Sequence, residues 1–218
     1  MIIDHTHPEY VKRRNKQGFG KYNGAYYYSK DICKYIIPNV KTNRNWVTVR
    51  MEDLPIPDHS IVFIHNNRNP NYYEYLKQYN DLILVCSIED TAEKVGFFGK
   101  SIVFPLSVNV ASVKKYYKEN KTKDMAFAGR RLKMNNRIPE KADILTDMPQ
   151  NKLIQAMSDY RTIFAVGRTA IQAKILGCEI GVYDSKYEDP SIWKIIDCSD
   201  AVKILQQKLD EIDGVNNE

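Results

Sequence analysis

Short apolar runs alternate with segments of helical periodicity along the whole chain of 218 residues. The clearest runs are 60–65 (Ser-Ile-Val-Phe-Ile-His) and 82–86 (Leu-Ile-Leu-Val-Cys). A strand that is apolar at nearly every position is buried on both faces, which is typical of a parallel sheet covered by helices. The alternation therefore predicts an α/β fold.

The pattern divides into two series of strands and helices. In the first series we expect a polar loop over 4–25, helices at 25–37, 72–78 and 87–95, and strands at 1–3, 46–49, 60–65, 82–86 and 101–105. In the second series we expect helices at 113–119, 149–158, 170–176 and 201–212, and strands at 124–128, 142–145, 162–166 and 179–183. Gly177 is well placed to end the helix at 170–176.

We interpret the two series as two small Rossmann-like domains, residues 1–108 and residues 109–218, with a cleft between them. One continuous doubly wound sheet is the alternative architecture. In both, ligands bind at the carboxyl ends of the strands.

Several classes of protein are disfavoured by composition. The longest unbroken apolar run has five residues, whereas a helix that crosses a bilayer needs about 20. The first residues lack a positive region followed by an apolar stretch, so we expect no signal peptide and a cytoplasmic protein. Four cysteines without a CxxC pair predict neither a zinc ribbon nor a disulfide framework, and Cys86 and Cys178 are expected to be buried.

Positive charge is concentrated in two segments. Residues 1–50 carry ten Lys and Arg against three Asp and Glu, and residues 112–137 carry nine against two. Such segments indicate an anionic partner, which is a phosphate-bearing small molecule or nucleic acid. A solvated surface is the simpler explanation of a charge run taken alone.

One candidate phosphate site follows the strand expected at 162–166. Gly167 there precedes a helix, so the backbone can approach a ligand closely, and the free N–H groups of the new helix favour a phosphate. Arg168 and Thr169 add donors to that anion. A tight turn without a ligand is the alternative role of Gly167.

A second candidate follows the strand expected at 124–128. This strand ends in Gly129-Arg130-Arg131, with Lys133 shortly after. Because both turns follow strands of the same expected sheet, they can face the same cleft. Together they predict a site for a diphosphate, as in a nucleotide sugar.

The two turns resemble the donor site of GT-B type glycosyltransferases, which have two Rossmann-like domains and bind the nucleotide sugar mainly in the C-terminal one. The resemblance implies that Gly129, Arg130 and Lys133 meet the donor phosphates. It covers most of the chain in order but is specific only over about residues 100–185. In the N-terminal half, residues 18–25 are similar to the family's first Gly-rich loop, which would place Gly20 over the phosphates.

The chain departs from this family at two acidic positions. By spacing, Gln172 takes the place of the helix Glu that typically holds the donor ribose, five residues before Gly177. The family's other acid would fall eight residues earlier, where this chain has Phe164. The departure favours, as an alternative to an enzyme, a nucleotide-sugar binding protein that has lost catalysis.

His65 is the first candidate for a catalytic base, because it lies at the carboxyl end of an expected strand. Asp4, His5 and His7 are its rivals, and a structural hydrogen bond is the alternative role of His65. His5 and His7 share a face if they lie on a strand, but the pattern shows no third metal ligand. No DxD-like pair follows a strand, so we expect no required metal and no cofactor.

The sequence leaves three functions open. The first is a metal-independent glycosyltransferase that acts on a nucleotide-sugar donor and an unidentified acceptor. The second is a catalytically inactive nucleotide or nucleotide-sugar binding protein. The third is a nucleic-acid binder, or a transferase whose acceptor is nucleic acid, that uses the two basic segments.

Overall fold

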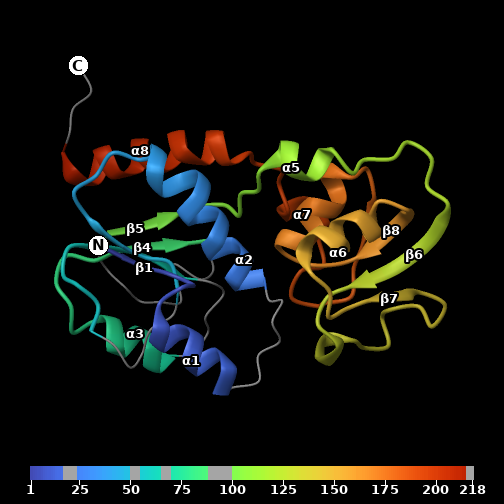
Figure 1. Cartoon of the computed structure of the whole chain (residues 1–218), viewed down its shortest axis with the longest axis horizontal. Helices are drawn as coiled ribbons and strands as arrows, with labels where there is room; N and C mark the ends of the chain where they lie inside the picture. The colour runs from blue at the N-terminus through green and yellow to red at the C-terminus, as the bar shows by residue number, and fades with distance from the viewer. Residues whose placement is uncertain (17–23, 50–54, 65–69, 88–99, 215–218) are drawn as a thin grey trace. The chain divides into compact units, whose positions relative to one another are not determined.

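The structure is a computed structural model that describes residues 1–16, 24–49, 55–64, 70–87 and 100–214. The described strands form two separate parallel sheets, one of five strands and one of four (Figure 1). Within the described residues, the chain divides into two compact units. Unit 1 takes those of 1–19, 25–105 and 199–218, and unit 2 takes those of 20–24 and 106–198.

The sheet of unit 1 follows the order of the chain, β1-β2-β3-β4-β5. Its strands are β1 (Ile2–Ile3), β2 (Asn45–Val47), β3 (Ser60–Ile64), β4 (Ile83–Cys86) and β5 (Lys100–Val103). Every residue of β3 and β4 is buried, as expected for strands that are apolar at nearly every position.

Helices cover both faces of this sheet. On one face α1 (Pro8–Lys16) and α3 (Pro70–Leu76) pack against alternate residues of the strands. Figure 1 shows α2 (Gly24–Asp31) and α8 (Cys198–Asp213) on the opposite side. Directly after α2 the chain continues as a π-helical segment, Ile32–Ile36. Both faces of β3 and β4 are therefore buried, which explains why these two strands lack polar alternation.

Helix α1 corrects one expectation, because the sequence predicted a loop over residues 4–25. The helix begins with Pro8, whose ring is compatible with the first helical position, and Glu9 lies in its first turn. Only Tyr10 of the described side chains in α1 is buried. A single buried residue produces no helical periodicity, so the hydrophobic pattern could not reveal this helix.

The C-terminal helix α8 belongs to unit 1, whereas the expected division at residue 108 put it with the second domain. Its buried residues Ala201, Leu205 and Leu209 recur every four positions and form one apolar stripe. The side chain of Gln206 accepts a hydrogen bond from the N–H of Lys41 at 2.7 Å and donates one to its carbonyl at 3.1 Å. These contacts join segments that lie far apart in the sequence.

Unit 2 contains the sheet β7-β6-β8-β9. Its strands are β6 (Lys123–Ala128), β7 (Asp143–Leu145), β8 (Tyr160–Phe164) and β9 (Glu179–Gly181). Three helices pack on one face of the sheet, namely α5 (Val110–Lys114), α6 (Gln150–Met157) and α7 (Arg168–Ile175). On the other face Phe127 packs with Ile138, Ala142 and Tyr183.

The α/β class and the parallel sheets are confirmed, and each expected strand has a counterpart within a few residues. One continuous sheet is wrong, because no described strand connects the two sheets. The expected helix at 87–95 lies almost entirely outside the described residues. Among the helices of the described ranges, none is both long enough and apolar enough to span a bilayer.

Candidate functional site

The two Gly-Arg turns of the sequence lie at the carboxyl ends of adjacent strands. β6 and β8 pair in parallel, with Phe127 opposite Phe164, so Gly129 and Val166 each lie two residues beyond the last pair. Neighbouring strands are about 5 Å apart. The structure therefore brings the starts of both turns together, as the sequence predicted for turns of one sheet.

The same two strands form a reversal point in the strand order. From β6 the chain passes to β7 on one side of the sheet, and it then returns to place β8 on the other side of β6. The segments that follow β6 and β8 consequently leave the sheet on opposite faces, Ile138 and Ala142 on one and α7 on the other. Ligands of open α/β sheets bind at such reversal points.

Gly167 makes the turn from β8 into α7. Its φ of 63° and ψ of −138° belong to a region that side chains strongly disfavour. Among the described residues, the nearest atom to a Cβ placed there is a methyl carbon of Leu106, at 3.8 Å. Backbone conformation, and not crowding by these residues, is therefore the reason for glycine.

The first turn of α7 presents backbone donors. The N–H of Ile171 donates to the carbonyl of Gly167 at 3.2 Å, which is the first hydrogen bond of the helix. The N–H groups of residues 168–170 precede it and have no acceptor within the helix. Together with the positive end of the helix dipole, these groups can bind a phosphate.

Two polar side chains of α7 are buried in unit 2. Gln172 is only 2% exposed, and its Nε2 has no hydrogen-bond partner among the described residues. An unsatisfied buried donor costs about 1–3 kcal/mol, which a ligand oxygen would recover. The guanidinium of Arg168 is also buried, and Thr169 is half-buried. The burial of Gln172 and Arg168 could not be predicted from the sequence, because apolar neighbours in the chain do not distinguish a buried polar side chain from an exposed one.

The turn after β6 requires glycine for a different reason, which is crowding by a neighbouring ring. A Cβ on Gly129 would lie 2.7 Å from the ring of Phe127, which is fully buried and packs edge-on against Tyr183. Arg130 follows in extended conformation and is exposed, as is Lys133 on the 3-10 turn Arg131–Lys133. In the described part of the chain no carboxylate forms an ion pair with Arg130, so its charge is available to an anion.

Arg130 also lies close enough to Tyr183 to act on it electrostatically. Burial raises the pKa of the Tyr183 phenol to about 12, and the positive charge of Arg130 opposes that rise. The phenol therefore stays neutral at neutral pH. Phe164, which stands at an acidic position of the GT-B pattern, packs its ring over Gly181, so that position supplies packing and no carboxylate.

The structure describes three of the four candidate bases, Asp4, His5 and His7, and does not describe His65. His65 and Gly20 lie outside the described residues, so their roles stay predictions. Asp4 and His5 follow β1, but His5 lies in a turn rather than on a strand, which removes the predicted shared face with His7. His7 instead accepts a hydrogen bond from the N–H of Glu9 at the start of α1.

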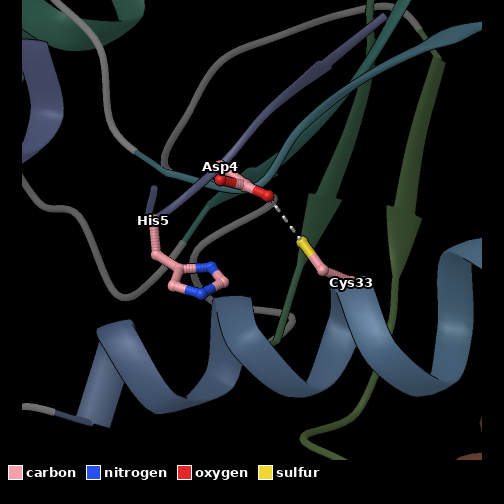
Figure 2. Close-up of side chains that lie close together, drawn as sticks. All are labelled: Asp4, His5 and Cys33. Carbon is pink, nitrogen blue, oxygen red and sulfur yellow. Dashed lines mark hydrogen bonds between the residues drawn. The ribbon is translucent and has the colours of Figure 1, made fainter. Parts of the chain in front are cut away.

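Sequence reasoning missed a group of side chains in unit 1. Asp4, His5 and Cys33 lie together, although Cys33 is 29 residues from Asp4 (Figure 2). Burial raises the pKa of the Cys33 thiol to about 11, with a further contribution from the charge of Asp4, so the thiol is protonated at neutral pH. Cys86 and Cys178 are buried, as predicted.

Comparison of the sequence with protein-family models finds no matching family, and comparison with curated proteins finds no matching relative. The functional argument therefore depends on the chemistry and geometry of these residues.

Proposed function

We propose that unit 2 binds the diphosphate of a nucleotide sugar, and that the chain transfers the sugar to an acceptor without a metal at the phosphates. The observation that carries the proposal is the pairing of β6 with β8, which sets two Gly-Arg turns side by side at the reversal point of the sheet. The backbone conformation of Gly167 and the buried amide of Gln172 support it.

Each residue has a distinct part in this proposal. Negative charge builds up on the diphosphate as the bond to the sugar breaks. Arg130, Arg168 and the first N–H groups of α7 stabilise that charge, in the way that fixed donors stabilise a developing oxyanion. The amide of Gln172 donates to a ribose hydroxyl, and His65 is the proposed base that activates the acceptor.

Equilibrium binding of nucleoside diphosphates and their sugars to the full chain tests the donor site. We expect one nucleoside diphosphate and its sugar to bind preferentially. Arg130→Ala removes a charge-assisted hydrogen bond of about 1.5–3 kcal/mol, so affinity falls roughly 10- to 100-fold. Arg161→Ala is the matched control, because Arg161 is an exposed arginine near the amino end of β8, at the opposite edge of the sheet.

The remaining outcomes separate the three functions. Specific binding followed by release of nucleoside diphosphate in the presence of acceptors supports a transferase. Tight binding without turnover supports an inactive binding protein. If no nucleotide binds but a DNA duplex does, with affinity that falls steeply as salt is raised, the proposal is wrong and the basic segments bind nucleic acid.

A further inference from the structure

Unit 1 gathers a second group of chemically versatile side chains at the carboxyl edge of its sheet. Asp4 and His5 directly follow β1, and Thr48 directly follows the neighbouring strand β2. Ser29 of α2 and Cys33 of the π-helical segment face them. π-helical turns within helices occur frequently at functional sites, so the position of Cys33 in such a turn is typical of a functional residue.

Three of these side chains offer metal ligands of three different kinds. A carboxylate oxygen of Asp4, a ring nitrogen of His5 and the sulfur of Cys33 all lie within 4.8 Å of one another, and each residue is half-buried (Figure 2). Asp4 Oδ2 and Cys33 Sγ are 3.6 Å apart. Two ligands of a tetrahedral zinc ion, with bonds of about 2.0 Å to oxygen and 2.3 Å to sulfur, are about 3.5 Å apart.

The surrounding groups already orient the carboxylate. The N–H and the hydroxyl of Thr6 both donate to Asp4 Oδ1 at 2.7 Å, so the second oxygen, Oδ2, is left directed at Cys33. Because both hydrogen bonds go to the same oxygen, the carboxylate is fixed in one rotation. Outer contacts of this kind hold the ligands of metal sites in place.

Two hydroxyl groups lie beside the other two side chains, His5 and Cys33. The Ser29 hydroxyl lies 3.4 Å from Nδ1 of His5 and 2.7 Å from the hydroxyl of Thr48. The Thr48 hydroxyl lies 3.8 Å from the sulfur of Cys33. The group is thus a connected polar network at a sheet edge, and the half-burial of its three ligands leaves a path for an ion.

We propose that Asp4, His5 and Cys33 bind a divalent transition-metal ion of the zinc class. Zinc accepts oxygen, nitrogen and sulfur ligands, whereas magnesium and calcium prefer oxygen alone. The thiol releases its proton to solvent as the sulfur–metal bond forms. Three protein ligands leave a fourth position for water or a hydroxyl group, which is the arrangement of catalytic rather than purely structural zinc sites.

This site belongs entirely to unit 1, so it is independent of the proposed diphosphate site in unit 2. Its closest rival is a hydrogen-bond network that binds no ion. The two differ in one measurable respect, because only a metal site binds zinc in a defined ratio through these three side chains.

Titration of the chelator-treated full chain with zinc, and separately with cobalt, tests the proposal. We expect one ion per chain, and a cobalt complex that absorbs in the near ultraviolet because a thiolate is bound. Cys33→Ser and His5→Ala each remove a ligand and should weaken zinc binding at least about 100-fold, beyond what the loss of an outer contact costs. Asp4→Asn keeps the shape of the side chain and should weaken binding as well.

Two variants serve as matched controls. Cys86→Ala removes another thiol of the same unit, and His7→Ala removes the neighbouring histidine that is not part of the group. Both should bind zinc as the unaltered chain does, and circular dichroism should show that all variants are folded. The proposal is overturned if zinc does not bind, if the ligand variants bind as well as the controls, or if the cobalt complex lacks the thiolate band.

Discussion

The two units use parallel sheets in different ways. In unit 2 the first strand of the sheet, β6, lies in its interior, so the strand order reverses between β6 and β8. In unit 1 the described strands follow the order of the chain, and β1 lies at the edge. Strand order therefore decides where residues that follow strands can gather.

The polar residues that follow the strands differ between the two units in accordance with the strand order. In unit 2 the residues after β6 and β8 lie at a reversal point, where we propose a phosphate site. In unit 1 Asp4 and His5 leave an edge strand, and the facing group comes from a helical segment, which supplies the thiol of Cys33. The comparison teaches that the same rule, polar residues at the carboxyl ends of strands, produces chemically different sites.

Two cations, Arg44 of unit 1 and Lys121 of unit 2, are held by different kinds of partner. In unit 1 the guanidinium of Arg44, 2% exposed, pairs with Asp81 at 3.1 Å and with Asp213 of α8 at 2.7 Å. In unit 2 the ammonium of Lys121 donates to the carbonyls of Ser158 and Leu176, at the ends of α6 and α7. Carboxylates can be titrated and carbonyls cannot, so acid is expected to weaken the contacts of Arg44 and not those of Lys121.

The chain carries one tryptophan in each unit, and both are buried. Trp46 lies in β2 of unit 1, and Trp193 lies in unit 2. Since the sequence has only these two, Trp193→Phe leaves a reporter in unit 1 and Trp46→Phe leaves one in unit 2. Tryptophan fluorescence in these two backgrounds can follow the unfolding of each unit.

The largest effect is expected from Leu205→Ala in α8. Leu205 is fully buried, and truncation of such a leucine costs about 2–5 kcal/mol. Because α8 belongs to unit 1, the urea transition reported by Trp46 should move to lower urea concentration. The transition reported by Trp193 should move less.

The control for this variant is Lys203→Ala on the same helix. The Lys203 side chain is 79% exposed, so its removal should change neither transition by more than about 0.5 kcal/mol. A larger shift at Trp193 than at Trp46 would contradict the assignment of α8 to unit 1.

Much of the fold was predictable because the central strands β3 and β4 are short, apolar and buried on both faces. Runs such as 60–65 and 82–86 carry that information locally, and so does Gly177, whose φ of 77° follows the end of α7. The order of the strands was not predictable, because it depends on pairings between distant segments. Asp4 and Cys33 illustrate the same limit for a site, since no local pattern relates them.

A smaller effect is expected from Gly167→Ala in unit 2. An alanine forced into this positive-φ conformation costs about 1–3 kcal/mol. The transition reported by Trp193 should therefore shift, and that of Trp46 should change less. Nucleoside diphosphate binding should weaken at the same time, because the first turn of α7 loses its entry geometry.

Gly24→Ala is the matched control for this substitution. Gly24 begins α2, has no positive φ, and a Cβ there would meet no atom of the described residues within 4 Å. Alanine in a compatible conformation is neutral or stabilises by up to about 1 kcal/mol. If Gly167→Ala proved as harmless as this control, the strained turn would have no energetic role.

The smallest expected effect is a difference in acid sensitivity. Hydrogen bonds with the His59 ring and with Lys100 lower the pKa of Asp81, and the hydrogen bond from Arg44 lowers the pKa of Asp213. Burial raises the pKa of Asp4, but the hydrogen bonds from Thr6 and Cys33 and the nearby charge of His5 together outweigh it, so the net pKa is lowered. In unit 2 hydrogen bonds from Ser191 lower the pKa of Asp189, which is exposed.

A carboxyl whose pKa is lower in the folded state stabilises that state at every pH above the unfolded pKa of about 3.9. The stabilisation disappears as the pH falls below that value and approaches the folded pKa. Between about pH 5 and pH 2, the urea midpoint reported by Trp46 should therefore fall more steeply than the midpoint reported by Trp193. Asp213→Asn should reduce the steepness at Trp46, since it removes one titrating partner of Arg44. A steeper fall at Trp193 would mean that carboxylates of unit 2, and not the ion pairs of Arg44, govern the response of the chain to acid.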